Sequence, residues 1–279
     1  MKIIKFLTLI LAVTLMVSCE KHEIEFGGEY VSDMAEFQLH YIAPVTAVAA
    51  NNLTRVDINN QMFANNRAPL NTYNAVPSGG VGRFYAVQPG NVNIKLYKLG
   101  KVTVDSLVYD QNVTLAKGKQ NLFVHDMTQP PVVFDNGYPY ERRQVVQDDS
   151  TIWVKFYNFL YETAGVPTTL KLQYQYLSHR TNELVNIGEP VAFAQTTGWQ
   201  QVLFIKEGPL DNDRRIDYRI KVIDDNGAVV GDLQIRNASG TYVSYSDWWT
   251  GILGRRYHHI FAGMRAAAPA SAVRVFTAL

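Results

Sequence analysis

Apolar and polar residues alternate strictly along several short stretches of this chain, and this alternation constrains the fold more than any other feature. Residues 91–96 read Asn-Val-Asn-Ile-Lys-Leu, and residues 36–41 and 55–59 alternate in the same way. Side chains of an extended strand point to opposite faces in turn, so each stretch predicts a half-buried antiparallel strand. Turn residues such as Pro89-Gly90 and Lys117-Gly118 separate the stretches, and helical periodicity is absent. The chain is therefore expected to be all-β.

The order of these strands recurs later in the chain. The apolar pattern of residues 37–41 recurs at 152–156. In the same order along the chain, the patterns of 56–58, 94–96 and 123–124 recur at 170–172, 220–222 and 260–261. A repeat of this length indicates two similar domains in tandem rather than a solenoid. We expect a first β-sandwich over 35–128, a linker over 129–150 and a second β-sandwich over 151–279. The linker contains Pro130-Pro131, which cannot sit in a central strand.

One hairpin is signalled clearly in the second copy. Residues 218–223 and 228–230 are apolar-rich runs separated by Asp224-Asp225-Asn226-Gly227. Asn-Gly supplies the two residues with positive φ that a tight type I′ turn requires. The sequence therefore predicts a hairpin with its turn at Asn226-Gly227.

Three segments of the first copy resemble a known family. They are Val-Asp-Ile-Asn at 56–59, Val-Gln-Pro-Gly-Asn-Val-Asn-Ile at 87–94 and Val-Thr-Leu-Ala-Lys-Gly-Lys at 113–119. This pattern is similar to the family called domain of unknown function 4397, and it covers 35–127 well and 151–265 more loosely. The resemblance implies small immunoglobulin-like antiparallel sandwiches, in tandem, in a secreted or anchored bacterial protein. It implies no catalytic residue.

The first 18 residues have the layout of a signal peptide. Lys2 and Lys5 precede an apolar run over 6–17, which is too short for a comfortable transmembrane span. A buried helix of the folded domain is the alternative. Residues 16–19, Met-Val-Ser-Cys, resemble the bacterial lipoprotein box, although Met16 stands where Leu is usual. The resemblance implies cleavage before Cys19, and acylation of Cys19 then provides a membrane anchor.

Residues 19–34 are expected to form a lipidated tether. Residues 20–25, Glu-Lys-His-Glu-Ile-Glu, resemble the surface-export signal of Bacteroidetes lipoproteins. This resemblance implies an outer-membrane lipoprotein on the cell surface, and an ordinary tether on the periplasmic face is the alternative. Asp105-Ser106-Leu107 and Asp149-Ser150-Thr151 resemble the O-glycosylation motif that these bacteria use on exported proteins.

No residue pattern in the sequence points to catalysis, although two carboxylates that face each other across a cleft, as glycosidases use, would leave no local signature. Cys19 is the only cysteine and is assigned to the lipid, and no Gly-x-Ser-x-Gly is present. His258 and His259 are adjacent in an expected strand and point to opposite faces, so we expect one packed and one exposed imidazole rather than a zinc site. A net charge of +1 gives no basic surface for nucleic acid. We expect no enzyme, no cofactor, no metal and no nucleic-acid partner.

Residues 242–251 hold the most suggestive group of side chains. Trp248 and Trp249 are adjacent in a strand or loop and cannot both face one core, so one of them is expected to be exposed. With Asp247, Arg255 and Tyr245 they are the candidate ligand-binding residues. An exposed indole stacks on sugar rings while Asp247 and Arg255 bond hydroxyls, or the same residues form a protein-binding hot spot. Alternatively, both tryptophans close the end of the second sandwich or a domain contact.

The sequence thus favours a membrane-anchored, extracytoplasmic, non-catalytic binding module that captures a glycan or another extracellular ligand. The alternative is a structural or interaction subunit of a cell-envelope assembly. In that case the exposed edges of its sheets would recruit strands from a protein partner.

Overall fold

The strands of this chain are seen in a computed structural model, which describes residues 33–78, 83–99, 105–136, 151–178, 181–203, 215–252 and 255–278. In these ranges the regular elements are strands and one 3-10 helix, η1 (Ala49–Asn51), which confirms the all-β prediction. None of the described segments is a helix long and apolar enough to cross a membrane. The predicted signal peptide, Cys19 and the tether up to residue 32 lie outside the described residues, as do Ser150 and the stretch 204–214.

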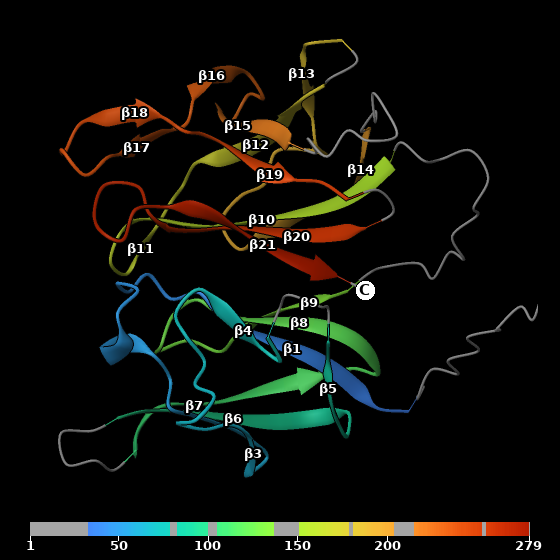
Figure 1. Ribbon diagram of the computed structural model, residues 1–279, viewed down its shortest axis with the longest axis vertical. Helices are drawn as coiled ribbons and strands as arrows, with labels where there is room; N and C mark the ends of the chain where they lie inside the picture. The colour runs from blue at the N-terminus through green and yellow to red at the C-terminus, as the bar shows by residue number, and fades with distance from the viewer. Residues whose placement is uncertain are drawn as a thin grey trace, which may run out of the picture. The chain divides into compact units, whose positions relative to one another are not determined.

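Two sheets build the first half of the described chain (Figure 1). The first inner sheet has the order β4-β1-β8-β9, with β5 also paired to β1, and the first outer sheet has the order β3-β2-β6-β7. Their bounds are β1 (Ala35–Tyr41), β2 (Arg55–Ile58), β3 (Gln61–Ala64), β4 (Asn74–Val76), β5 (Tyr85–Val87), β6 (Gly90–Leu99), β7 (Asp105–Leu115), β8 (Gly118–Val124) and β9 (Val132–Asp135).

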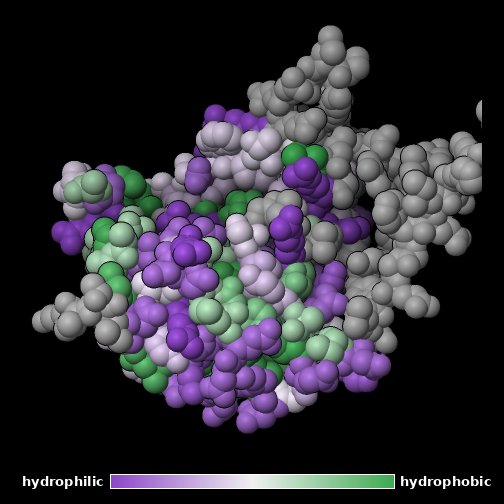
Figure 2. All heavy atoms as spheres, turned by 60° about the horizontal axis from the view of Figure 1, so that its bottom comes forward, coloured by the Kyte–Doolittle hydropathy of each residue, from purple (hydrophilic) through white to green (hydrophobic). Residues whose placement is uncertain are grey.

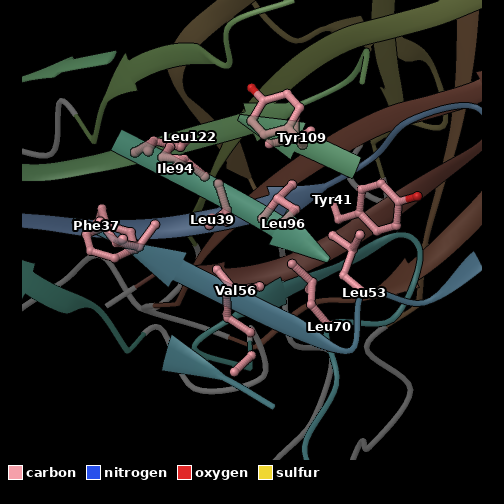
Figure 3. Packing of buried hydrophobic residues seen from close by; sticks show 14 of the residues in the cluster. Phe37, Leu39, Tyr41, Leu53, Val56, Leu70, Ile94, Leu96, Tyr109 and Leu122 are labelled. Carbon is pink, nitrogen blue, oxygen red and sulfur yellow. The ribbon is translucent and has the colours of Figure 1, made fainter. Parts of the chain in front are cut away.

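The apolar faces of these two sheets meet in the first core. Phe37 and Leu39 of β1, in the inner sheet, lie in one cluster with Val56 of β2 and Ile94 of β6, in the outer sheet (Figure 3). All four side chains are buried. This is the arrangement that the alternation over 91–96 predicts, because every second residue of β6 faces the core. Burying each such side chain stabilises the fold by about 1.5–3 kcal/mol.

Three further sheets build the second half. The second inner sheet has the order β11-β10-β20-β21 with β14 on β10, the second outer sheet has the order β13-β12-β15-β16 with β19 on β15, and β17 pairs with β18. Their bounds are β10 (Thr151–Thr163), β11 (Val166–Pro167), β12 (Lys171–Leu177), β13 (Leu184–Asn186), β14 (Gln195–Leu203), β15 (Arg215–Ile223), β16 (Val229–Asp232), β17 (Gln234–Arg236), β18 (Tyr242–Ser244), β19 (Ser246–Thr250), β20 (Arg256–Met264) and β21 (Ala272–Ala278).

Strands that the internal repeat equates pair in the same way in both halves. β1 lies parallel to β8, and β10 lies parallel to β20. β2 is antiparallel to β6, and β12 is antiparallel to β15. The prediction of antiparallel strands therefore misses these two central pairs, because alternation within a strand carries no information about the direction of its neighbour. The immunoglobulin-like assignment stays a prediction.

The two inner sheets face each other across a third core (Figure 1). Phe123 of β8, Tyr157 and Phe159 of β10 and Phe276 of β21 are buried there. This core corrects one expectation for residues 36–41, whose polar positions were predicted to face solvent. His40 and Gln38 are fully buried, because Phe276 of the second inner sheet packs on the imidazole of His40 and the amide of Gln38 donates to the carbonyl of Pro77 at 3.3 Å.

The predicted linker also contains a strand. β9 runs antiparallel to β8, from Phe123 opposite Val132 to Gln120 opposite Asp135. Pro130-Pro131 immediately precedes it, and β9 is the edge strand of its sheet, where prolines are tolerated. Residues 137–150, including Glu141-Arg142-Arg143, lie outside the described part.

The predicted hairpin is present between β15 and β16, but its turn differs from the prediction. Gly227 has φ of +84°, whereas Asn226 is not among the residues with positive φ, so the turn is not type I′. The carboxylate of Asp224 instead accepts hydrogen bonds from the amides of Asn226 and Ala228, at 2.9 and 2.8 Å. This local side-chain bond favours a wider turn with a single left-handed glycine.

His258 and His259 do point to opposite faces of β20, as predicted, but neither is exposed. The second core lies between the second inner and outer sheets and includes Tyr174 of β12 and Phe261 of β20. His258 Nδ1 lies 3.0 Å from the hydroxyl of Tyr157 in the third core, and His259 Nδ1 lies 2.7 Å from the hydroxyl of Tyr174 in the second core. The expectation of one exposed histidine fails because β20 is covered on both faces.

The opposite side of the first outer sheet faces solvent. Asn91 and the other polar positions of β6 alternate with its buried residues. Figure 2 turns the bottom of Figure 1 toward the viewer and shows a largely hydrophilic face with scattered apolar residues. No large apolar area that would demand a partner stands out in this view.

Candidate ligand-binding groove

β19 places the two adjacent tryptophans on opposite faces of the second outer sheet. Trp248 lies opposite Asp217 of β15, and Trp249 lies opposite Ile216. Trp249 is 4% exposed and belongs to the second core, whereas Trp248 is 49% exposed. The prediction that one tryptophan faces solvent is therefore confirmed.

Trp249 anchors β19 to the core. Its indole meets the ring of His259 edge to face, with centroids 4.7 Å apart and planes at 88°, and it packs 5.7 Å from the ring of Tyr218. Burial lowers the pKa of His259 to about 3, so this imidazole is neutral at ordinary pH. Aromatic contacts of this kind hold β19 rigidly and fix the position of Trp248 on the opposite face.

A hydroxyl network fixes the start of β19. The hydroxyls of Tyr218 and Tyr245 lie 3.0 Å apart, and both donate toward Oδ2 of Asp247, at 3.3 and 3.5 Å. The amide of Val273 donates to the Tyr245 hydroxyl at 3.1 Å. Burial raises the pKa of both tyrosines, so they remain protonated donors to the carboxylate.

The outward face of β15 and β19 is hollowed into a groove of about 650 Å³. Trp248 lines it together with Asp217 and Arg219 of β15, and Glu183 and Leu184 close it beside β13. The volume is in the range of small-molecule sites. An exposed indole with planar charged side chains around it can stack on a ring and hydrogen-bond its substituents.

The guanidinium of Arg215 stacks on the exposed indole of Trp248. Its guanidinium carbon lies 5.1 Å from the ring centre of Trp248, and its Nη2 and Nε lie 2.6 and 3.0 Å from Oδ1 of Asp217. An exposed cation–π contact contributes about 0.5–1 kcal/mol. Because the ion pair itself is partly exposed, it adds little free energy, but it sets the position of the guanidinium. One face of Trp248 is thus occupied by Arg215.

The structure brings together only part of the predicted group. Trp248 and Asp247 line the groove, whereas Trp249 of β19 and Tyr245, which immediately precedes β19, are buried in the core below it. Arg255 is exposed just before β20 and does not line the groove, so its predicted role beside Asp247 has no support from the geometry.

Sequence reasoning missed the contribution of β15. Arg215, Asp217 and Arg219 occupy alternate positions of that strand and share its outward face. The alternation Arg-Ile-Asp-Tyr-Arg over 215–219 is a readable signal for a charged strand face. Their proximity to Trp248 was not readable, since it depends on which strand β19 pairs with.

Two other hollows are less suited to a ligand. One, of about 380 Å³, lies between Phe63, Tyr85 and Arg83, and another, of about 560 Å³, is lined mainly by Ala266–Ala268 and by Arg236. Arg236 already donates to the carbonyl of Gly240 at 2.9 Å. Within the described ranges, no group of three or more histidine, cysteine or acidic side chains is placed to hold a metal ion.

Searches for related proteins found no family model that matches this chain and no curated protein that matches it. The resemblance to domain of unknown function 4397 and the lipoprotein assignment therefore rest on the residue patterns given above.

Proposed function

We propose that this chain is a membrane-anchored, extracytoplasmic binding module that captures a glycan in the groove beside Trp248. The observation that carries the proposal is a half-exposed indole, braced by Arg215 on one face and set in a groove of about 650 Å³. Sugars bind proteins by stacking a C–H face on an aromatic ring while planar polar side chains bond the hydroxyls.

The anchoring half of the proposal rests on Cys19. A signal-peptide layout ends in the only cysteine of the chain, and acylation there would hold the protein to the outer membrane. The tether over 19–34 would then place the binding groove outside the cytoplasm, on the cell surface or on the periplasmic face.

A glycan array with the full-length protein tests the binding half. Trp248→Ala should abolish the signals that the wild-type protein gives. Tyr242→Ala is the matched control, because Tyr242 is 47% exposed and is also stacked by an arginine, Arg265, with 5.6 Å from guanidinium carbon to ring centre. Tyr242 lies outside the groove, so its loss should leave binding unchanged. An array without signals for the wild-type protein would overturn the proposal.

One observation favours the second candidate, a structural or interaction subunit of a cell-envelope assembly. β16 is the edge strand of the second outer sheet, and its Val229 and Val230 are 60% and 68% exposed. An unpaired edge with apolar side chains can accept a strand from another protein. Co-purification of a stable partner after gentle detergent extraction, lost in Val229→Lys/Val230→Lys, would support this function over the first.

A further inference from the structure

The outward face of the second outer sheet is divided into two rows of side chains that cross the strands. The first row holds Trp248 of β19, opposite Asp217 of β15, and continues through Leu177 of β12 to Leu184 of β13, which pairs with Leu177. Tyr176 pairs with Tyr218, and the same register carries Leu177 level with Asp217. Three spacings between strands make this row about 14 Å long.

The second row is polar. Ser246 of β19 lies opposite Arg219 of β15, and Arg219 lies opposite Gln175 of β12. It runs beside the first row, two residues and about 7 Å further along the strands. The apolar side chains of the groove, Trp248, Leu177 and Leu184, therefore lie in the first row, where Asp217 stands between them and is paired with Arg215, and the second row offers the hydrogen-bonding groups of Arg219 and Ser246.

A pyranose ring has the same division, with an apolar C–H face and an edge of hydroxyl groups. Hydroxyls both donate and accept, so they suit a groove that offers a guanidinium and a carboxylate. Across the residues that the structure describes, Arg219 and Glu183 line the groove without a hydrogen bond or ion pair from their side chains. These two side chains are available to a ligand, whereas Asp217 is engaged by Arg215.

The charge of the groove selects among sugars. Its described lining carries two positive groups, Arg215 and Arg219, and three negative groups, Glu183, Asp217 and Asp247, which gives a net charge of −1. A negatively charged cleft repels an anionic ligand. Among the described side chains of the groove, Arg219 is the only arginine without a partner, and its single positive charge does not offset the net negative charge.

From these observations we infer that the groove takes a neutral oligosaccharide laid across the strands from Trp248 toward Leu184, and that it rejects acidic glycans. One sugar ring stacks on the face of Trp248 that Arg215 leaves open, and its hydroxyl edge lies toward Arg219 and Ser246. This inference rests on the proposed glycan-binding function and specifies its ligand class.

Calorimetric titration of the full-length protein in detergent tests the inference. The probes are neutral tetrasaccharides of glucose, mannose and galactose, and the acidic probes are tetragalacturonate and a sulfated heparin tetrasaccharide. We expect at least one neutral probe to bind, about tenfold or more tighter than any acidic probe, and Trp248→Ala to weaken it about tenfold or more. Tighter binding of an acidic probe would overturn the inference and leave the proposed function standing. No binding of any probe would overturn both.

A charge reversal gives an independent readout. Glu183→Lys changes the net charge of the described lining from −1 to +1, so acidic probes should gain about tenfold in affinity at low salt and lose the gain at high salt. Glu189→Lys is the matched control, because Glu189 is exposed and lies outside the groove. Equal gains in both variants, or none in either, would show that the groove charge does not exclude acidic glycans.

Discussion

His40 and Phe123 lie directly opposite each other on the parallel strands β1 and β8, and their rings stack with centroids 4.6 Å apart and planes 15° from parallel. The ring of Phe276, from β21 in the second half, meets the imidazole of His40 edge to face, with centroids 4.9 Å apart. Nε2 of His40 lies 3.2 Å from Oδ1 of Asn121. The core between the two inner sheets therefore encloses a titratable group.

This enclosure predicts loss of stability in mild acid. Burial lowers the pKa of His40 to about 4 and that of His259 to about 3, and it lowers the pKa of His258 as well. Below pH 6.5 the unfolded chain takes up protons that the folded chain refuses, so the free energy of unfolding falls as pH drops toward 4. Each buried histidine contributes up to about 1.4 kcal/mol per pH unit. Urea unfolding at pH 7.5, 5.5 and 4.5 measures this slope.

His40→Gln identifies the contribution of a single site. The glutamine amide can still bond Asn121, so the variant removes the titrating group while keeping a polar partner. Its stability should fall less steeply between pH 6.5 and 4.5 than that of the wild type. Parallel curves for the two proteins would contradict the assignment of the acid sensitivity to His40.

Gly263 of β20 should not tolerate a side chain. Its φ is +122°, and a Cβ atom there would lie 2.7 Å from Cα of Ser271 and 2.9 Å from the carbonyl oxygen of Ala270. Gly263→Ala should cost about 3 kcal/mol, because backbone strain and a backbone clash add. Gly118→Ala is the control, with φ of +92° and no atom within 4 Å, and should cost about 1 kcal/mol. Equal costs in thermal unfolding would refute the clash.

The two tryptophans should separate stability from binding. Trp249→Ala removes a buried indole from the second core and should destabilise the protein by about 3–5 kcal/mol. Trp248→Ala removes only the exposed stacking with Arg215 and should cost no more than about 1 kcal/mol while abolishing glycan binding. Chemical denaturation of both variants provides the comparison, and a large loss of stability in Trp248→Ala would mean that this residue serves the fold.

Acylation is predicted at a single position. Since Cys19 is the only cysteine, Cys19→Ala leaves no thiol that a lipid could occupy. The variant should lose incorporation of labelled palmitate and move from the detergent-rich to the aqueous phase on phase separation. Mass spectrometry of the wild-type protein should find residues 1–18 removed, and an intact amino terminus would contradict the lipoprotein assignment.

The fold could be predicted from the sequence for strands that are buried on one face and exposed to solvent on the other. β6 shows this, because Ile94 and its alternate neighbours are buried while Asn91 is exposed. β1 shows the limit, since His40 looks like a surface residue in a local window but is covered by a distant sheet. Burial on the second face depends on packing between segments far apart in the chain, which periodicity does not encode.

The groove was only half predictable for the same reason. Adjacent tryptophans in a strand must face opposite ways, so the exposure of Trp248 followed from local geometry. Arg215 and Asp217 join it through the pairing of β15 with β19, two strands separated by a long stretch of chain. Arg255, which is close to Trp248 in sequence, lies outside the groove.

The parallel pairing of β1 with β8 and of β10 with β20 also has a consequence for biogenesis. Ala35 meets Gly118, and Trp153 meets Arg256, so each central pair joins the first strand of its half to a strand near the end of that half. Contacts between residues this distant close late and slow the acquisition of structure. In a chain that emerges amino terminus first from an export channel, β4 and β5 can pair with one edge of β1 early, but the other edge stays open until β8 emerges, and a periplasmic chaperone would have that edge to shield in the interval.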